Sequence, residues 1–100
     1  MKNVYTEEYI FSCLACCEAI IDKNLYLTKV WKNTLTEGGE FEAKARKWMA
    51  YRTMIRQLLS GRYSTKEIIC RSKSCQKKST QKAVKEIVAQ IHKGDVQLEE

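Results

Sequence analysis

The side chains with the clearest chemical potential gather in the stretch RSKSCQKKSTQK, residues 71–82. It carries five Lys or Arg side chains, no acidic residue and almost nothing apolar. Cations at this density attract the phosphate backbone of a nucleic acid, because binding releases the counterions condensed on it. Anionic membranes and acidic proteins are attracted by the same field. The stretch therefore predicts a polyanion-binding surface, with nucleic acid as the leading candidate and a plain solvated surface as the alternative.

The positive charge of the chain is concentrated around this stretch. Residues 61–93 contain nine Lys or Arg and two acidic residues, a formal charge of +7. Residues 1–60 carry +2 and residues 94–100 carry −3, within a total of +6. The basic character therefore belongs to one segment rather than to the whole chain.

Five cysteines and one histidine raise the question of a metal site. Cys13 and Cys16 have the spacing of half a zinc site. A distant set would have to complete it: Cys70, Cys75 and His92. The first pair lies in an apolar helical stretch, where cysteine behaves as a small hydrophobic residue. We therefore expect core thiols there and no metal.

Redox chemistry and catalysis have less support in the sequence. Cys70 and Cys75 lie among cations that favour a thiolate, so a redox-sensitive thiol is an alternative to an ordinary free thiol. No acidic residue is placed by the sequence to orient His92. The pair Gly38 and Gly39 lacks the Gly-Lys-Ser/Thr of a phosphate-binding loop. We therefore expect a protein that is not an enzyme and needs no cofactor. The odd number of cysteines separately predicts reduced thiols, and hence an intracellular, cytoplasmic protein.

The composition favours an all-α fold. The chain of 100 residues has no proline, four glycines and 44% hydrophobic residues, which recur at helical spacings. This length is near the lower limit for an independent core, so a homodimer would bury useful additional surface. We expect one dimeric domain of five helices, with a helical core and dimerisation region in residues 1–60, a basic segment in 61–94 and an acidic tail in 95–100. No apolar run is long enough to predict a membrane span, and the N-terminal residues MKNVYTEEYI lack the charged region followed by an apolar region that is typical of a signal peptide.

Three helices are expected in residues 1–60. The first runs from the cap Thr6 to about residue 23, the second from the cap Asn24 to the glycine pair at 38 and 39, and the third from about residue 40 to residue 60. Their apolar residues predict the buried side chains. These are Tyr9, Ile10, Cys13, Leu14, Cys17, Ile20 and Ile21 in the first helix, Leu25, Leu27, Val30, Trp31 and Leu35 in the second, and Trp48, Tyr51, Ile55, Leu58 and Leu59 in the third.

Two further helices are expected in the basic segment. Gly61 has the position of a left-handed residue after the third helix. Ser64 and Glu67 then have the spacing of a capping box for a short helix that reaches about residue 71. The last helix ends at Gly94, and the remainder DVQLEE is expected to fray. Residues 72–80 form either a turn that leads into this last helix or a disordered arm. The last helix is predicted to bury Ala83, Val84, Ile87, Val88 and Ile91.

Residues 51–68, YRTMIRQLLSGRYSTKEI, are similar to the tryptophan-repressor-like family of bacterial and phage helix-turn-helix regulators. In that family a long helix ends in an apolar pair and a glycine, and a capped short helix with Glu-Ile or Glu-Leu follows. The matching positions are Ile55, Leu58, Leu59, Gly61, Ser64, Glu67 and Ile68. Where tryptophan-binding members carry an arginine and a Thr-Arg-Gly-Ser run, this chain has Tyr51 and Thr80 followed by Gln81. We therefore expect no tryptophan binding.

The resemblance implies roles for the basic stretch. The short helix from Ser64 would cross the DNA backbone, and the following helix would present its first side chains to the major groove. Base edges would be read by Gln76, Ser79 and Gln81. Phosphates would be neutralised by six cations: Lys66, Arg71, Lys73, Lys77, Lys78 and Lys82.

The leading hypothesis from the sequence is a regulator of transcription that binds double-stranded DNA. The alternative is a small helical inhibitor or adaptor of a mobile element, whose basic face binds an acidic surface or the nucleic-acid channel of a partner protein. The polar composition of residues 70–80 favours this alternative, because a protein-facing arm needs no packed recognition helix. A membrane-surface role is disfavoured, because the basic segment lacks the apolar face of an interfacial helix.

Overall fold

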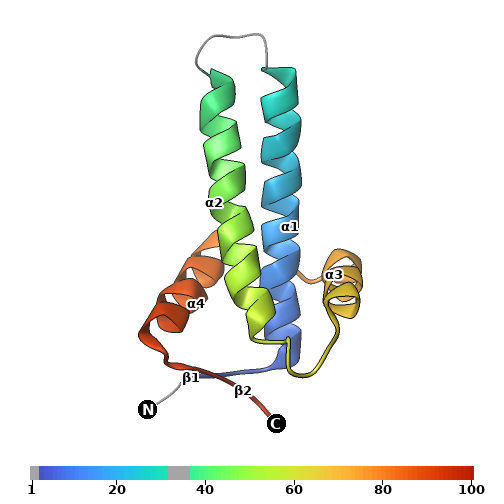
Figure 1. Ribbon diagram of the computed structural model, residues 1–100, viewed down its shortest axis with the longest axis vertical. Coiled ribbons are helices and arrows are strands. Elements are labelled where there is room, and N and C mark those ends of the chain that lie inside the picture. Colours follow the sequence, from blue (N-terminus) through green and yellow to red (C-terminus); the bar gives the residue numbers. More distant parts are fainter. Residues whose placement is uncertain (1–2, 32–36) are drawn as a thin grey trace.

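A long hairpin of two antiparallel helices forms the axis of the protein, and two shorter helices pack around one end of it (Figure 1). The computed structural model describes residues 3–31 and 37–100, with principal extents of 49 × 27 × 20 Å. The described residues are mostly helical, as predicted. None of these helices is both long enough and apolar enough to cross a bilayer. The elements in chain order are β1 (Asn3–Tyr5), α1 (Glu7–Val30), α2 (Glu37–Gln57), α3 (Thr65–Ser74), α4 (Gln81–Lys93) and β2 (Val96–Leu98).

Helix α1 is continuous where two helices were predicted. It begins at the expected cap, since the Tyr9 amide donates to Thr6 Oγ1 at 3.1 Å. Asn24, the expected cap of a second helix, is instead buried inside α1, where its Nδ2 donates to the Ile20 carbonyl at 2.8 Å. Because this side chain is satisfied within the helix, it does not compete with the helical backbone. The described residues therefore contain four helices rather than the predicted five.

The distal half of α1, which ends at Val30, is more exposed than predicted. Leu25, Val30 and Trp31 were expected to be buried, yet they are 43%, 55% and 40% exposed. Leu35, also expected to be buried, lies outside the described residues. Among the described elements, α2 alone runs beside this half of α1 in Figure 1, so one neighbouring helix covers one stripe of it.

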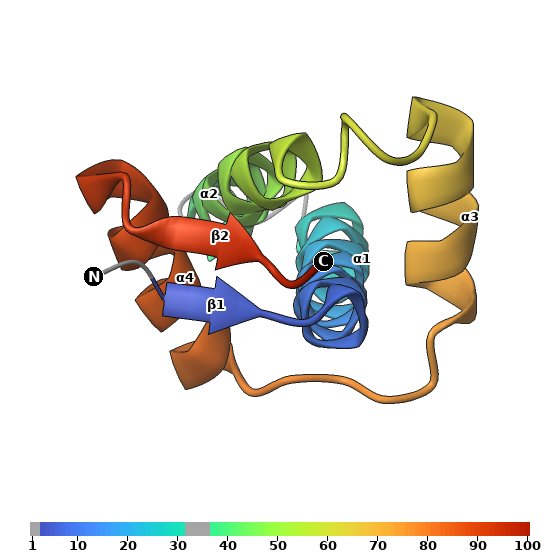
Figure 2. The same ribbon diagram turned by 90° about the horizontal axis from the view of Figure 1, so that it is seen from below.

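The proximal half of α1 is enclosed on all sides. Every residue from Ile10 to Glu18 is buried. Seen along the hairpin, α2, α3, α4 and the chain that joins α3 to α4 surround this part of α1 (Figure 2). The core contains Ile10, Phe11, Cys13, Leu14, Cys16, Cys17, Ile20, Ile21, Trp48, Ile55, Leu59, Ile68, Val84, Ile87 and Val88.

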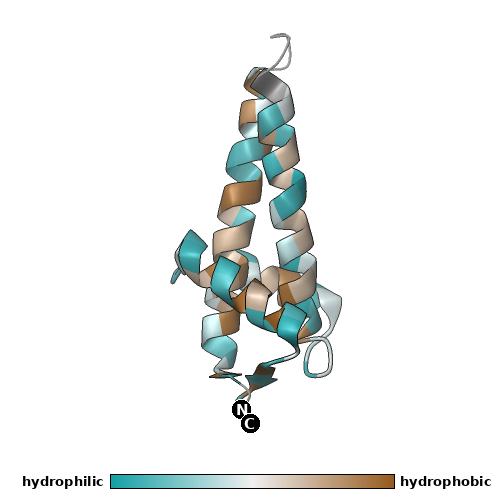
Figure 3. Cartoon of the chain, turned by 90° about the vertical axis from the view of Figure 1, so that its left-hand side faces the viewer, coloured by the Kyte–Doolittle hydropathy of each residue, from teal (hydrophilic) through white to brown (hydrophobic). Residues whose placement is uncertain are grey.

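Helix α4 is amphipathic and ends as predicted. Thr80 caps its start and Gly94 ends it in the left-handed region at φ 72°. The amides of Gly94 and Asp95 donate to the carbonyls of Ile91 and Gln90, both at 3.0 Å, which is the Schellman pattern. Hydrophilic and hydrophobic residues alternate along α4 and along the hairpin behind it in Figure 3. The hydrophobic side of α4 accounts for its place against α1 and α2.

Helix α2 ends differently from the prediction. It stops at Gln57, and Gly61 does not take a positive φ. Instead, the amides of Leu58, Leu59 and Ser60 donate to carbonyls three residues back at 3.0–3.3 Å. These 3₁₀-type bonds satisfy the last carbonyls of the helix, so a left-handed glycine is not required.

Helix α3 begins with the predicted capping box and runs one turn further than expected. The Glu67 amide donates to Ser64 Oγ at 3.2 Å, and the Ser64 amide donates to the Glu67 carboxylate at 3.3 Å. The extra turn contains Ser72, which is buried and donates its Oγ to the Ile68 carbonyl at 2.5 Å. A small side chain at this position lets α3 approach α1 closely.

The two ends of the described chain pair with each other, which corrects the expectation of a frayed tail. Strands β1 and β2 are parallel, with Asn3 opposite Val96 and Tyr5 opposite Leu98. The Glu99 amide extends the pairing by donating to the Tyr5 carbonyl at 2.8 Å. Val96 and Leu98 are partly buried against the core. Pairing of residues more than ninety positions apart leaves no local signal in the sequence.

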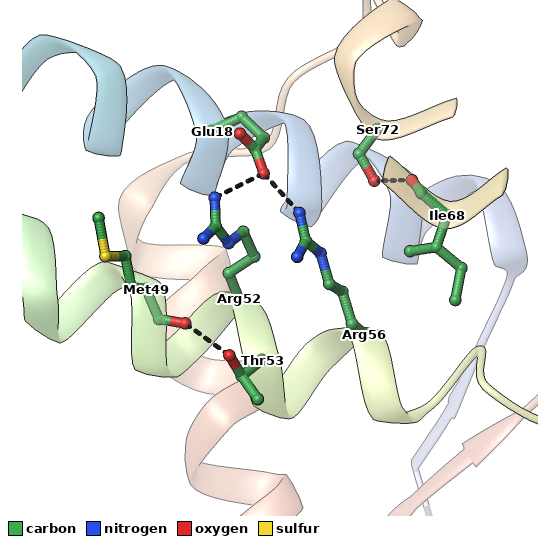
Figure 4. Close-up of polar contacts among 7 residues, drawn as sticks. All are labelled: Glu18, Met49, Arg52, Thr53, Arg56, Ile68 and Ser72. Carbon is green, nitrogen blue, oxygen red and sulfur yellow. Dashed lines mark hydrogen bonds and ion pairs between the residues drawn. The ribbon is translucent and has the colours of Figure 1, made fainter. Parts of the chain in front are cut away.

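A charged triad lies at the junction of α1 and α2 (Figure 4). Glu18 Oε1 accepts from Arg52 Nη1 at 3.0 Å and from Arg56 Nη2 at 2.9 Å. The carboxylate is almost fully buried, and the Nε groups of both arginines find no acceptor within the described residues. Burial, followed by the neighbouring Arg52 charge, lowers the pKa of Arg56. One carboxylate therefore holds two partly buried cations.

We expect Glu18→Gln to lower the free energy of unfolding by about 3–5 kcal/mol, because it leaves two arginines without their counter-charge. Urea denaturation followed by circular dichroism measures the change. Glu42→Gln is the matched control, since Glu42 pairs with Arg46 at 2.7 Å on the surface and its loss should cost at most about 1 kcal/mol. An equal decrease in the free energy of unfolding for the two variants would contradict a structural role for the triad.

Candidate nucleic-acid interface

The predicted basic stretch forms the end of α3, an extended connection and the start of α4. Residues 75–80, here called the strap, contain no helix or strand and pass across α1 (Figure 2). Helices α3 and α4 consequently lie on opposite sides of α1. The chain adopts neither of the two predicted alternatives: there is no tight turn with a recognition helix packed on α3, and instead of a disordered arm there is an extended connection bonded to α1. The strap provides too few apolar side chains to pack a helix, and α1 takes the space between α3 and α4.

The strap is attached to α1 through Ser12. Ser12 Oγ donates to the Lys77 carbonyl at 2.6 Å, and the Ser79 amide donates to the Ser12 carbonyl at 3.2 Å. The Ser79 hydroxyl also lies 3.5 Å from Cys13 Sγ. Inside the strap, Cys75 Sγ donates to the same Lys77 carbonyl at 3.2 Å. These contacts place the backbone on either side of Lys78.

Helix α3 is held against α1 by aromatic contacts. The Arg71 guanidinium lies over the rings of Phe11 and Tyr63, at 4.4 and 4.8 Å from their centroids. The two rings meet edge to face, with centroids 5.7 Å apart. Arg71 was predicted to contact phosphate, and it remains exposed. Arg71 therefore has a structural role as well, because its guanidinium stacks on the Phe11 ring and so joins α3 to α1.

Glu7 completes this attachment. Its carboxylate accepts from the Tyr63 hydroxyl at 2.6 Å and from Arg62 Nη1 at 2.8 Å, and Arg62 also donates to the Glu99 carbonyl at 2.8 Å. The hydrogen bond from Tyr63, and then that from Arg62, lower the pKa of Glu7. Glu7 and Arg62 thereby join the start of α1, the turn before α3 and the residues after β2.

The cations predicted to contact phosphate are all exposed. Arg71 and Lys77 line one hollow of about 370 Å³, and Lys73 and Lys78 line another of about 290 Å³. The strap lies beside both hollows. Lys85, which the sequence analysis did not select, is exposed one turn after Lys82 on α4. The exposed cations contributed by α3, the strap and the first turns of α4, here called the basic surface, are Lys66, Arg71, Lys73, Lys77, Lys78, Lys82 and Lys85.

The residues predicted to read bases do not share one helical face. Gln76 lines the hollow with Arg71, whereas the Ser79 hydroxyl points toward Cys13. Gln81 lines a different hollow, between α1 and α2. The structure therefore brings together the predicted phosphate contacts around the strap but separates the predicted base contacts.

Besides Lys85, the sequence did not single out Ser12, which lies buried beneath this surface. It is one of only a few polar residues in the run from Ile10 to Glu18 and is 5% exposed. A hydroxyl at such a position needs a partner, because an unpaired buried hydroxyl is costly. A search for polar residues within the predicted apolar helix could have identified it, although not its partner.

The three cysteines of α1 lie in the core, as expected. Burial raises the pKa values of Cys13 and Cys16, and it raises that of Cys17 to about 12. Cys70 is exposed and Cys75 is partly exposed. In the described part of the chain, no three His, Cys, Asp or Glu side chains are grouped as a metal site would require.

Stability should fall in acid in a way that depends on Glu7. A carboxylate with a lowered folded-state pKa stabilises the protein above its unfolded pKa, near 4.3, and this contribution is lost as the pH falls through the folded value. We expect the melting temperature of Glu7→Gln to fall less steeply than that of the wild type as the pH is lowered below about 4.3, measured by thermal melts across pH. Glu8→Gln keeps the Glu7 carboxylate and should keep the acid limb. A Glu7→Gln profile parallel to that of the wild type would contradict this assignment.

Thiol reactivity should divide the cysteines into two groups. A thiol reagent such as Ellman's reagent should label Cys70 and Cys75 rapidly in the native protein, while the three buried thiols react only on unfolding. Labelling in denaturant gives the total of five. The double variant Cys70→Ser/Cys75→Ser should lose the rapid phase. A rapid phase that survives in this variant would show that the α1 cysteines are accessible.

Comparison of the chain with protein-family models, with curated proteins and with solved structures found no match. The resemblance of residues 51–68 to the tryptophan-repressor-like family therefore stays a prediction.

Proposed function

We propose that this protein binds double-stranded DNA through the basic surface and acts as a regulator of transcription. The observation that carries the proposal is the position of the strap. Its two lysines project from a backbone that is attached to α1. Cations from α3 and α4 flank them on either side. A nucleic acid would therefore meet an ordered set of cations rather than a loose arm.

The electrostatics of the surface favour a polyanion. From Ile68 to Lys85 the chain contains no acidic residue. The acidic side chains that share the hollows beside the strap are Glu8, Glu18 and Asp22 of α1. Glu18 is already paired with two arginines. The cations of the surface therefore outnumber the acidic groups available to neutralise them.

The geometry supports phosphate contacts more than base reading. The candidate base-reading residues face different hollows, and the strap presents no helix to the major groove. Lysine contacts to phosphate supply affinity and position with little sequence information. We therefore propose a DNA-binding mode with strong salt dependence and modest discrimination among sequences.

One observation favours a second candidate function. The extended strap differs from a recognition helix, and a basic surface without base readers also fits an acidic protein surface. An inhibitor or adaptor that binds such a partner should show weak duplex affinity and form a stable complex in a pull-down from its native host.

The predicted homodimer likewise stays a prediction, and its candidate contact surface is the exposed apolar set Leu25, Tyr26 and Val30 on α1.

Fluorescence anisotropy of a labelled duplex tests the DNA proposal. The double variant Lys77→Glu/Lys78→Glu should weaken duplex binding by about tenfold or more at low salt. The slope of log affinity against log salt concentration should become shallower by the amount that corresponds to about two phosphate contacts. Unrelated duplex sequences should bind with similar affinity.

The matched control is Lys29→Glu/Lys47→Glu, which changes the net charge equally on the hairpin away from the strap. It should retain most of the affinity. Absence of duplex binding by the wild type at low salt, or equal losses in the two double variants, would rule out the proposed surface.

A further inference from the structure

The strap lacks the hydrogen-bond ladder that usually fixes extended backbone. Residues 75–80 belong to neither a helix nor a sheet, yet they carry the two lysines at the centre of the basic surface. Two of the contacts that hold this backbone to α1 are made by Ser12, and a third is the 3.5 Å contact between the Ser79 hydroxyl and Cys13 Sγ. The Ser12 hydroxyl binds the Lys77 carbonyl, and the Ser12 carbonyl binds the Ser79 amide.

We infer that Ser12 is a positioning residue for nucleic-acid binding: by holding both sides of Lys78, it orders the strap so that Lys77 and Lys78 are presented before the ligand arrives. This inference rests on the proposed function. Ser12 itself is 5% exposed and does not reach the ligand. It acts through the backbone of residues 77 and 79.

The physical basis is the entropy of the strap. Ordering a flexible segment when a ligand binds subtracts from the affinity, whereas a segment that is already ordered avoids this cost. Ser12 contributes a short hydrogen bond at a buried position, where loss of the donor is poorly compensated by water. The Cys75 thiol also binds the Lys77 carbonyl, but it belongs to the strap and cannot attach it to α1.

Ser12→Ala should weaken binding of a mixed-sequence duplex by roughly fivefold, as expected for the loss of one partly buried hydrogen bond. The salt dependence should stay that of the wild type, because the same lysines still reach the phosphates. This combination distinguishes positioning from direct contact, since removal of Lys77 and Lys78 lowers the salt dependence. Amide exchange should show faster exchange at Ser79, while the core amides of α1 remain protected.

Ser74→Ala is the matched control, because the Ser74 hydroxyl binds the Arg71 carbonyl within α3 and makes no bond to α1. It should bind as the wild type does. Ser12→Thr, which keeps the hydroxyl, should recover most of the lost affinity. If Ser12→Ala does not fold, a Gly-Gly insertion between Gln76 and Lys77 loosens the strap without changing α1 and should produce the same loss at unchanged salt dependence.

Two results would overturn this inference while leaving the proposed function intact. One is equal affinity of the wild type and Ser12→Ala, and the other is unchanged exchange at Ser79 in that variant. A wild type that binds no duplex at low salt overturns the proposed function and this inference together.

Discussion

The enclosure of the proximal half of α1 is the constraint on which the rest of the structure depends. A helix that is buried on all sides needs neighbours around its whole circumference, and a chain of this length must supply them from its remaining segments. Small side chains along this stretch, among them Ala15 and the three cysteines, allow those neighbours to approach closely. The polar residues in the stretch determine which neighbour lies where. Glu18 requires the arginines of α2, and Ser12 is satisfied by the backbone of the strap.

The basic surface is the outer side of this enclosure. Helix α3, the strap and the start of α4 each direct apolar or small side chains inward, as Ser72, Ser79 and Val84 illustrate. The cations of the same segments are left outside. Concentration of positive charge on one part of the molecule therefore follows from the order of residues in three consecutive segments. The segments are fixed by their inner contacts, and the outer charges are available for a ligand.

The features that the sequence predicted correctly are those with local causes. The predicted caps Thr6 and Ser64 act on amides three residues away, and the terminator Gly94 acts on the last turn of its own helix. The apolar stripes of α1 and α4 also identified most of the core. Exposure of Leu25 and Val30 was not predictable in this way, because a stripe shows which side of a helix is apolar but not whether a neighbour covers it.

The features that the sequence did not predict depend on distant partners. Asn24 is compatible with either a cap or a helix interior; in the structure it is buried inside α1 and donates to the Ile20 carbonyl. The strap depends on a bond between Ser12 and Lys77, sixty-five residues apart. The candidate phosphate contacts could be chosen by charge alone and are all exposed. The candidate base contacts depended on a recognition helix, and the path of the chain across α1 separates them.

The parallel pairing of β1 and β2 has a consequence for the synthesis of the protein. Residues 3–5 are made before α1, and their partners at 96–98 are made only after α4. Three of the segments that enclose α1 also follow the hairpin, so α1 emerges long before its cover is complete. During that interval a helix rich in apolar and cysteine side chains is open to other molecules in its surroundings. The strand pair that joins residues 3–5 to residues 96–98 can therefore form only after α4 has been made.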